Sequence, residues 1–223
     1  MHPRRRHPTH GPGAGASGAD GSSARLSRRW DQALDRNVVT LHPGDYFVAT
    51  AGELIGTVLG SCVSACVRDR RLGLGGMNHF MLPEDSSEGK SLWASASTRF
   101  GNIAMERLIN DILKLGGRRQ ELEVKLVGGG RVLETITDIG STNVKFVRDY
   151  VAAEGFPVVG EDLGGIQPRK VLYDPASGAA RVKKLARAEG SRVVAQERRY
   201  RRNIERQLAD GGIELFYGEI ELF

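Results

Sequence analysis

The sequence predicts an α+β protein: antiparallel or mixed β-sheets built from hairpins, two main helices packed on them, and a C-terminal basic helix and strand. Short alternating apolar runs bounded by turn residues occupy most of the chain, which is typical of strands. Only two segments before residue 185 show the 3.6-residue apolar period of a helix. Strands grouped in hairpins, with few helices between them, favour α+β over a doubly wound parallel sheet.

The composition is that of one main domain with extensions. Its 223 residues suffice for a sizeable core, and 40% of them are apolar. No stretch approaches the roughly 18–20 uninterrupted apolar residues that span a bilayer, and no apolar run follows the N-terminal arginines to make a secretory signal. With two cysteines four positions apart, a disulfide framework is not expected. We therefore expect a cytoplasmic protein with reduced thiols and no transmembrane segment.

Residues 1–29 form a low-complexity segment of Pro, Gly, Ala, Ser and Arg, for which we expect a disordered basic tail. The segment contains six arginines and one aspartate, and its net charge of +5 equals that of the whole chain. Residues 30–223 therefore carry no net charge, and the high isoelectric point comes from the tail. This balance argues against nucleic acid as a partner of the body.

The main domain, residues 30–184, is expected to begin with three strands and a hairpin. Apolar alternation places the three strands at 38–41, 46–50 and 53–59. The hairpin pairs 62–67 with 72–82 across a polar break at 69–71.

Two helices and four further strands complete the expected domain. The first helix follows a polar loop at 84–91, has Ser97 or Thr98 as N-cap, and ends at Gly116. Residues 99–102 at its start are candidates for substrate positioning. The second helix runs from Ser141 as N-cap to Gly155. The four strands are expected at 122–127, 156–161, 169–173 and 179–183, the last two joined by the turn sequence at 174–178.

The C-terminal extension, residues 185–223, is expected to be a helix at 187–209 and a strand at 213–223. Ten Lys and Arg residues stand against three glutamates between Arg181 and Arg206. Two interpretations stay open for this basic helix. It could meet acidic receptor helices or a membrane surface by electrostatic attraction, or it could pack on the domain with a solvated charged face.

The hairpin contains the residues best suited to chemistry. If its turn centres between Arg70 and Arg71, Cys62 lies directly opposite His79, with Cβ atoms about 4.5–5.5 Å apart. A free cysteine has a pKa of about 8.5, and its thiolate is the nucleophile. A neighbouring histidine can take the thiol proton and stabilise that thiolate.

Residues near Cys62 could supply the rest of such a site. A tight bend at Gly60 and Ser61 would expose backbone N–H groups that could bind the oxyanion of an attacked carbonyl. The hydroxyl or carbonyl of Thr57 could orient the ring of His79. The alternative is structural: a small buried cysteine packed beside a core histidine.

Two segments with this spacing resemble a known family. GTVLGSCVSAC at 56–66, followed by GGMNHFMLP at 75–83, is similar to the chemoreceptor glutamine deamidases of bacterial chemotaxis, the CheD family. The likeness continues through 99–117, 125–144 and 161–178, so it covers about residues 38–184.

The resemblance implies a deamidase-like catalytic domain in which a Cys–His–Thr set hydrolyses particular receptor glutamines to glutamate through a thioester. Cys62 would be the nucleophile, His79 the base and Thr57 the third residue. In some members the threonine stands one position further from the cysteine, where this chain has Gly56. Ser61, Gly60 and Asn78 are the candidates for substrate positioning or oxyanion binding.

The resemblance also implies partners. The substrates would be chemoreceptor cytoplasmic domains, and a response-regulator phosphatase of the same pathway would be a second partner. The alternative function is a non-catalytic binding module that regulates such a phosphatase or receptor. Packing alone would not require both Cys62 and His79, which favours the enzyme.

Redox, metal and phosphate-binding functions receive less support. On one strand, Cys62 and Cys66 would be about 13 Å apart at ~3.3 Å per residue, too far for a disulfide. These two cysteines and His79 offer no fourth ligand and lack the spacing of metal ligands, so a metal is not expected. No other cofactor is expected. The glycines at 128–130 are not followed by the Lys-Ser/Thr pair of a phosphate loop. Close backbone packing near the site is the expected reason for them.

Overall fold

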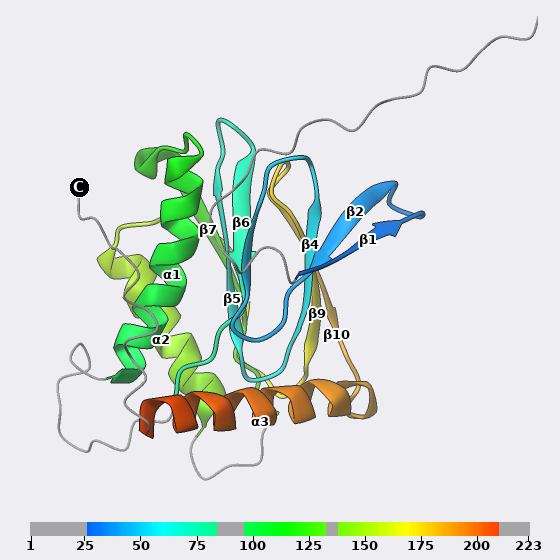
Figure 1. Ribbon diagram of the computed structural model, residues 1–223, viewed down its shortest axis with the longest axis vertical. Coiled ribbons are helices and arrows are strands. Elements are labelled where there is room, and N and C mark those ends of the chain that lie inside the picture. Colours follow the sequence, from blue (N-terminus) through cyan, green and yellow to red (C-terminus); the bar gives the residue numbers. More distant parts are fainter. Residues whose placement is uncertain (1–25, 84–95, 133–137, 210–223) are drawn as a thin grey trace, which may run out of the picture.

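The computed structural model describes residues 26–83, 96–132 and 138–209. Two five-stranded sheets pack face to face, helices α1 (Ala96–Lys114) and α2 (Ile139–Ala153) cover the second sheet, and helix α3 (Arg187–Ala209) crosses one end of the sheets (Figure 1). The predicted α+β class is confirmed. None of the described helices is long and apolar enough to cross a membrane.

The first sheet has the strand order β1-β2-β4-β9-β10. Its strands are β1 (Ser27–Asp31), β2 (Arg36–Thr40), β4 (Leu54–Leu59), β9 (Arg169–Asp174) and β10 (Ala179–Lys184). Only the β2–β4 pair is parallel. Strands β9 and β10 form the hairpin expected from the turn sequence at 174–178, which Gly178 closes with a φ of 74° and a 2.7 Å hydrogen bond from its N–H to Asp174 O.

The second sheet has the strand order β3-β6-β5-β7-β8. Its strands are β3 (Tyr46–Ala49), β6 (Leu74–Asn78), β5 (Val63–Asp69), β7 (Leu122–Gly128) and β8 (Val158–Leu163). Strands β7 and β8 pair in parallel, and helix α2 supplies the long connection that a parallel pair requires. The short 3₁₀ helix Arg119–Glu121 leads into β7.

Strand β5 separates two hydrophobic cores. Because side chains alternate along a strand, Val63, Ala65 and Val67 face the core beneath α1 and α2, while Cys66 faces the core between the two sheets. All three valine and alanine side chains are fully buried. This double burial explains why the strand reads as a nearly continuous apolar run in the sequence.

The register of the β5–β6 hairpin differs from the prediction. Asp69 and Leu74 form the last pair of the ladder, so the turn occupies residues 70–73. The predicted direct opposition of Cys62 and His79 is therefore wrong by two positions, and both residues lie just outside the strands. A shift of two keeps each side chain on its original face of the sheet, so the two can still approach each other.

Asp69 accounts for the longer turn. Its carboxylate accepts hydrogen bonds from the N–H groups of Arg71 and Leu72 at 2.9 and 3.0 Å. Its carbonyl accepts a third, at 3.0 Å, from Gly73, whose φ is 63°. An aspartate that bonds to its own backbone two and three residues on initiates a turn at once, and this moves the turn centre towards Leu72.

The predicted helices are present, with two corrections to their N-caps. Helix α1 begins at Ala96, so Ser97 and Thr98 lie inside its first turn and neither is its N-cap. Asp138, and not Ser141, is the N-cap of α2: its carboxylate accepts hydrogen bonds from both the N–H and the hydroxyl of Ser141. Helix α3 has the predicted limits. Strand β1 includes residues 27–29 of the predicted tail; the rest of that tail up to 25, the polar loop at 84–91 and the strand at 213–223 lie outside the described residues.

We predict that Asp69→Ala lowers the free energy of unfolding by about 2–4 kcal/mol, because three part-buried hydrogen bonds from backbone N–H groups lose their acceptor. The carboxylate also accepts a 2.9 Å hydrogen bond from Arg118 N. Although burial raises it, these backbone bonds and the charge of Arg71 leave the pKa of Asp69 below its ordinary value. A depressed pKa in the folded state stabilises the fold above the unfolded-state pKa, and this contribution is lost as the pH falls through the folded-state pKa.

Urea unfolding of the two proteins across pH checks this prediction. The difference between wild type and variant should be largest near neutral pH and should shrink below about pH 3.9. Asp149→Ala is the control, since Asp149 forms an exposed i,i+4 pair with Lys145 on α2, and it should change stability by less than about 0.5 kcal/mol. Equal effects from the two substitutions would contradict the assignment of Asp69 as the turn anchor.

Candidate active site

Residues 60–62 form a short loop between β4 of the first sheet and β5 of the second. All three of its carbonyls accept hydrogen bonds from elsewhere: Gly60 O from Gly130 N, Ser61 O from Asn143 Nδ2 and Cys62 O from Gly129 N, each at 2.8 Å. A loop held by its carbonyls turns its N–H groups to the opposite side. These three N–H groups, of Gly60, Ser61 and Cys62, are called the amide nest below.

The glycines at the end of β7 and directly after it allow this arrangement. A Cβ atom on Gly128, whose φ is 115°, would lie 2.3 Å from Cys62 O. Gly129 has a φ of 67°, which is unfavourable for residues with a side chain. The expectation of close backbone packing near the site is confirmed.

A carboxylate from α3 occupies the amide nest. Glu197 Oε1 accepts hydrogen bonds from Gly60 N at 2.7 Å and Cys62 N at 3.2 Å, and its Oε2 accepts from Ser61 N and Ser61 Oγ, each at 2.8 Å. The Glu197 side chain is fully buried. Four hydrogen-bond donors therefore stabilise a carboxylate that would be costly to bury without partners.

Thr57, on β4, determines which nitrogen of His79 is free. The Thr57 hydroxyl donates its single proton to Leu41 O at 2.9 Å, and its oxygen lies 2.8 Å from His79 Nδ1. The oxygen must therefore accept from Nδ1–H, which assigns the lone pair of the neutral ring to Nε2. Within the described residues, Nε2 is buried and has no hydrogen-bond partner.

Cys62, His79 and Glu197 meet at the nest. One ligand-type atom of each (the thiol sulfur, a ring nitrogen and a carboxylate oxygen) lies within 4.8 Å of the other two. Burial, with a smaller effect from His42, lowers the pKa of His79 to about 3, so the ring is neutral at physiological pH. Burial, followed by the charge and hydrogen bonding of Glu197, raises the pKa of Cys62 well above its ordinary value. This arrangement holds a neutral thiol beside a neutral base.

These three side chains also have the spacing of metal ligands, but their hydrogen bonding does not fit a metal. Each carboxylate oxygen of Glu197 already accepts two hydrogen bonds, which uses the roughly four lone-pair directions of a carboxylate. We therefore assign no metal to the described site.

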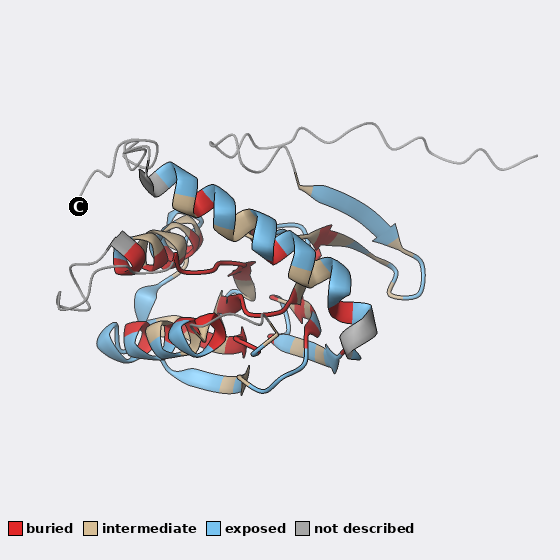
Figure 2. Ribbon diagram, turned by 90° about the horizontal axis from the view of Figure 1, so that it is seen from below, coloured by how far each residue is buried: buried red, intermediate tan, exposed pale blue. Residues whose placement is uncertain are grey.

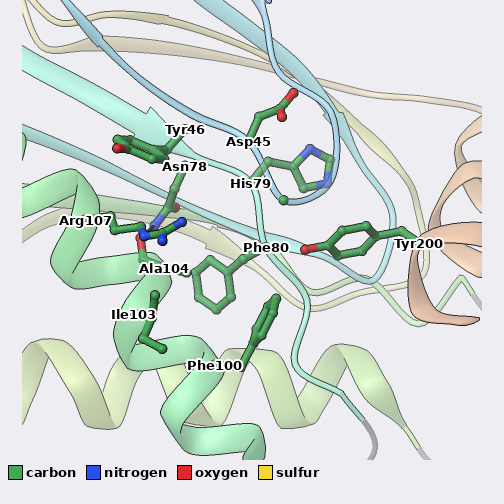
Figure 3. Close-up of a pocket in the computed structure, with 11 residues that line it drawn as sticks. Asp45, Tyr46, Asn78, His79, Phe80, Phe100, Ile103, Ala104, Arg107 and Tyr200 are labelled. Carbon is green, nitrogen blue, oxygen red and sulfur yellow. Dashed lines mark hydrogen bonds between the residues drawn. The ribbon is translucent and has the colours of Figure 1, made fainter. Parts of the chain in front are cut away.

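A pocket opens beside His79 between α1 and α3 (Figure 3). Its walls include the aromatic side chains of Phe80, Phe100 and Tyr200, with Ile103 and Arg107 from α1. Phe100 belongs to the 99–102 segment considered for substrate positioning. The lining of the pocket is largely apolar and includes the imidazole of His79.

Comparison with known proteins identifies the family. A family described as "CheD chemotactic sensory transduction" matches residues 81–184. A protein of Halorhodospira halophila named "Probable chemoreceptor glutamine deamidase CheD" is 52% identical over 196 residues, which cover 86% of this chain and 90% of the relative. The chain belongs to the CheD family. Relatives of the same name from Hydrogenovibrio crunogenus and Rhodopseudomonas palustris are 48% and 43% identical, over 86% and 95% of this chain and 100% and 99% of their own lengths.

In this CheD-family chain, most of the predicted site residues lie together. Cys62 and His79 meet as described, Thr57 bonds to the imidazole, and the N–H groups of Gly60 and Ser61 point into the nest. These placements agree with the hydrogen-bonding functions that the sequence suggested.

Asn78 is the exception. Its Oδ1 accepts a 2.8 Å hydrogen bond from Ala65 N, and its Nδ2 donates to Ala104 O at 3.0 Å. Although Asn78 borders the pocket, its amide connects β5 to α1 and is not available to an oxyanion. The side-chain amide of Asn78 is therefore left out of the proposed oxyanion site, while substrate positioning by this residue stays a prediction.

Two side chains of the site were missed by the sequence analysis. Asn143 donates to Ser61 O and accepts a 2.8 Å hydrogen bond from Leu82 N, and it is fully buried. A polar residue on the apolar face of α2, one turn before Val147, was the available signal. Glu197 had a similar signal, as an acid in a strongly basic helix.

We predict that Asn143→Ala lowers the free energy of unfolding by about 2–4 kcal/mol, because two buried backbone groups lose their partners. Asn110→Ala is the matched control: this asparagine is exposed on α1, so its loss should change stability by less than about 0.5 kcal/mol. Chemical denaturation measures both. A similar small effect at both positions would show that Asn143 does not hold the 60–62 loop.

Proposed function

We propose that this CheD-family protein is a chemoreceptor glutamine deamidase that hydrolyses particular glutamine side chains of chemoreceptors to glutamate in bacterial chemotaxis. The observation that carries the proposal is the placement of the Cys62 thiol and the His79 ring beside three converging N–H groups. The names of the relatives supply the substrate class. The site-based argument and the family assignment lead to the same reaction.

The first half of the reaction forms a thioester. His79 Nε2 takes the proton of the Cys62 thiol, and Sγ attacks the side-chain carbonyl carbon of the glutamine. The carbonyl oxygen becomes an oxyanion, which the amide nest can stabilise by hydrogen bonds. When the tetrahedral species collapses, the C–N bond breaks and the imidazolium gives its proton to the departing ammonia.

The second half consumes one water. His79, now neutral, takes a proton from the water as its oxygen attacks the thioester carbonyl. The C–S bond breaks, the proton returns to sulfur, and the glutamate carboxylate leaves. The net change is amide and water to carboxylate and ammonium, and the catalyst is regenerated.

Thr57 is a positioning residue in this scheme. By accepting from Nδ1–H, it keeps the lone pair of His79 on Nε2, the atom that takes the thiol proton in this scheme. It need not touch the substrate.

The proposed substrate determines location and partners. Chemoreceptor cytoplasmic domains are the proposed partners, and the cytoplasm is therefore the proposed location. A response-regulator phosphatase of the same pathway stays a prediction. The alternative is a binding module without catalytic activity. The next experiment distinguishes it from an enzyme.

We predict that Cys62→Ala lowers ammonia release from a purified chemoreceptor cytoplasmic domain by at least about 10³-fold, because the nucleophile is lost. Cys66→Ala is the matched control, since Cys66 is equally buried but lies on β5, facing the core between the sheets. The control should keep nearly all activity. Mass spectrometry of the receptor should show conversion of glutamine to glutamate with Cys66→Ala and none with Cys62→Ala. Full activity of Cys62→Ala would exclude the thiol mechanism.

We predict that Thr57→Val, which removes the hydroxyl at nearly constant volume, lowers kcat by about 10- to 100-fold. The variant should also alter the pH–rate profile, since Nδ1–H loses its acceptor and the ring loses its preferred tautomer. Thr57→Ser restores the hydroxyl and should recover most of the rate. A valine variant with wild-type kcat and pH profile would remove Thr57 from the mechanism.

A further inference from the structure

Helix α3 brings a glutamate side chain to the place where the proposed reaction produces one. The Glu197 carboxylate accepts hydrogen bonds from all three nest N–H groups and lies within 4.8 Å of the thiol and the imidazole. A bound product glutamate would make the same contacts with the same groups. The helix therefore presents the chemical group of the product on a helical backbone.

Helix α3 packs on the rest of the protein through residues on one of its faces. Among its described side chains, the buried positions are Gly190, Glu197 and Ile204, spaced seven residues apart on an otherwise largely exposed helix (Figure 2). Positions seven apart in a helix lie on the same face. Glu197 is at the centre of this face, so the helix is seated by contacts on both sides of the carboxylate.

Close packing on either side of Glu197 supports this seating. A Cβ on Gly190 would lie 2.3 Å from Pro168, so the absence of a side chain allows the helix to approach. Towards the other end, the Tyr200 ring packs on Gly44, where a Cβ would lie 2.9 Å from its Cε2. Tyr200 also lines the pocket beside His79 (Figure 3).

The seated helix also suppresses the chemistry. Glu197 occupies the hydrogen-bond donors that an oxyanion needs, and its negative charge disfavours a thiolate at Cys62. With α3 in place, substrate amide and Glu197 cannot use the nest at the same time.

We infer that α3 is an intramolecular product mimic that occupies the substrate-binding surface and inhibits the enzyme until it is displaced. This inference rests on the proposed deamidase function. It identifies the binding partner as an amphipathic helical segment with glutamine at the position of Glu197, a small residue seven positions before it, and apolar residues three and seven positions after it. The path of α3 across the end of the sheets is then the path of the substrate helix.

The inference makes the Glu197→Gln variant its own intramolecular substrate. Cys62 would attack the introduced side-chain amide, ammonia would leave, and water would release a glutamate at position 197. We predict that peptide mass mapping of the purified full-length variant shows the acid at this position, accumulating with time or already complete. The double variant Glu197→Gln, Cys62→Ser should retain the amide. Gln196, which contacts His42 from the same helix, is an internal control that should stay unchanged.

Removal of the carboxylate tests inhibition independently. In Glu197→Ala, alkylation of Cys62 by iodoacetamide should be more than about tenfold faster than in the wild type, because the loss of even one hydrogen bond to a charged group shifts the opening equilibrium by about that factor. Receptor deamidation should also accelerate. Cys66 should stay unreactive in both proteins, and Glu205→Ala, on the same helix but paired with Arg201, should match the wild type.

The outcomes separate this inference from the proposed function. Unchanged Cys62 alkylation in Glu197→Ala, or loss of receptor deamidation in that variant, would overturn inhibition by α3. If the Glu197→Gln variant deamidates receptors but keeps its own introduced amide, the claim that α3 follows the substrate path is overturned. Conversion of that amide without any action on receptors would support the mimicry and overturn the proposed substrate.

Discussion

The backbone of residues 60–62 is restrained through its carbonyls, and the geometry of the site follows from that restraint. Gly129 and Gly130 bond two of these carbonyls and Asn143 bonds the third. Since the carbonyls are all directed away from the site, the three N–H groups converge where an acyl oxygen can be bound. The preceding strand belongs to the first sheet and the following strand to the second, so the loop lies where the chain crosses between sheets.

The crossing of the chain between the two sheets also brings the side chains of Thr57 and His79 together. Thr57 comes from β4 of the first sheet, whereas His79 follows β6 of the second. Their 2.8 Å hydrogen bond therefore connects the two sheets directly. The tautomer of the imidazole depends on the packing of one sheet against the other, because a small displacement would break this bond. The core between the sheets thus supports the chemistry as well as the fold.

Features that depend on neighbouring residues could be predicted from the sequence. The limits of α3 and the β9–β10 hairpin follow from helical periodicity and turn residues, and both were correct. The turn at 70–73 shows the limit of this reasoning, because one side-chain acceptor, Asp69, shifted the register by two positions. Cys62 and His79 still met, since a shift of two preserves the face of the strand.

Contacts between distant segments could not be predicted. Glu197 lies 135 residues after Cys62 in the chain, and no local pattern encodes a hydrogen bond across that separation. Asn143 is a similar case, since a single polar residue on a helix does not indicate which loop it will bind. The side-chain contacts of Asn78 are a further case. Its place in the family-like segment suggested chemistry, while its amide holds β5 and α1 together.

The central claim is that the three nest amides bind the carboxylate of Glu197 and, when α3 is displaced, the substrate carbonyl. Backbone amide hydrogen exchange of Gly60, Ser61 and Cys62, measured by NMR in the wild type and in Glu197→Ala, tests it most directly. The account predicts slow exchange of all three amides in the wild type, faster exchange in the variant, and renewed protection when a chemoreceptor cytoplasmic domain is added. Equal exchange in the two proteins, or no protection by the receptor domain, would contradict it.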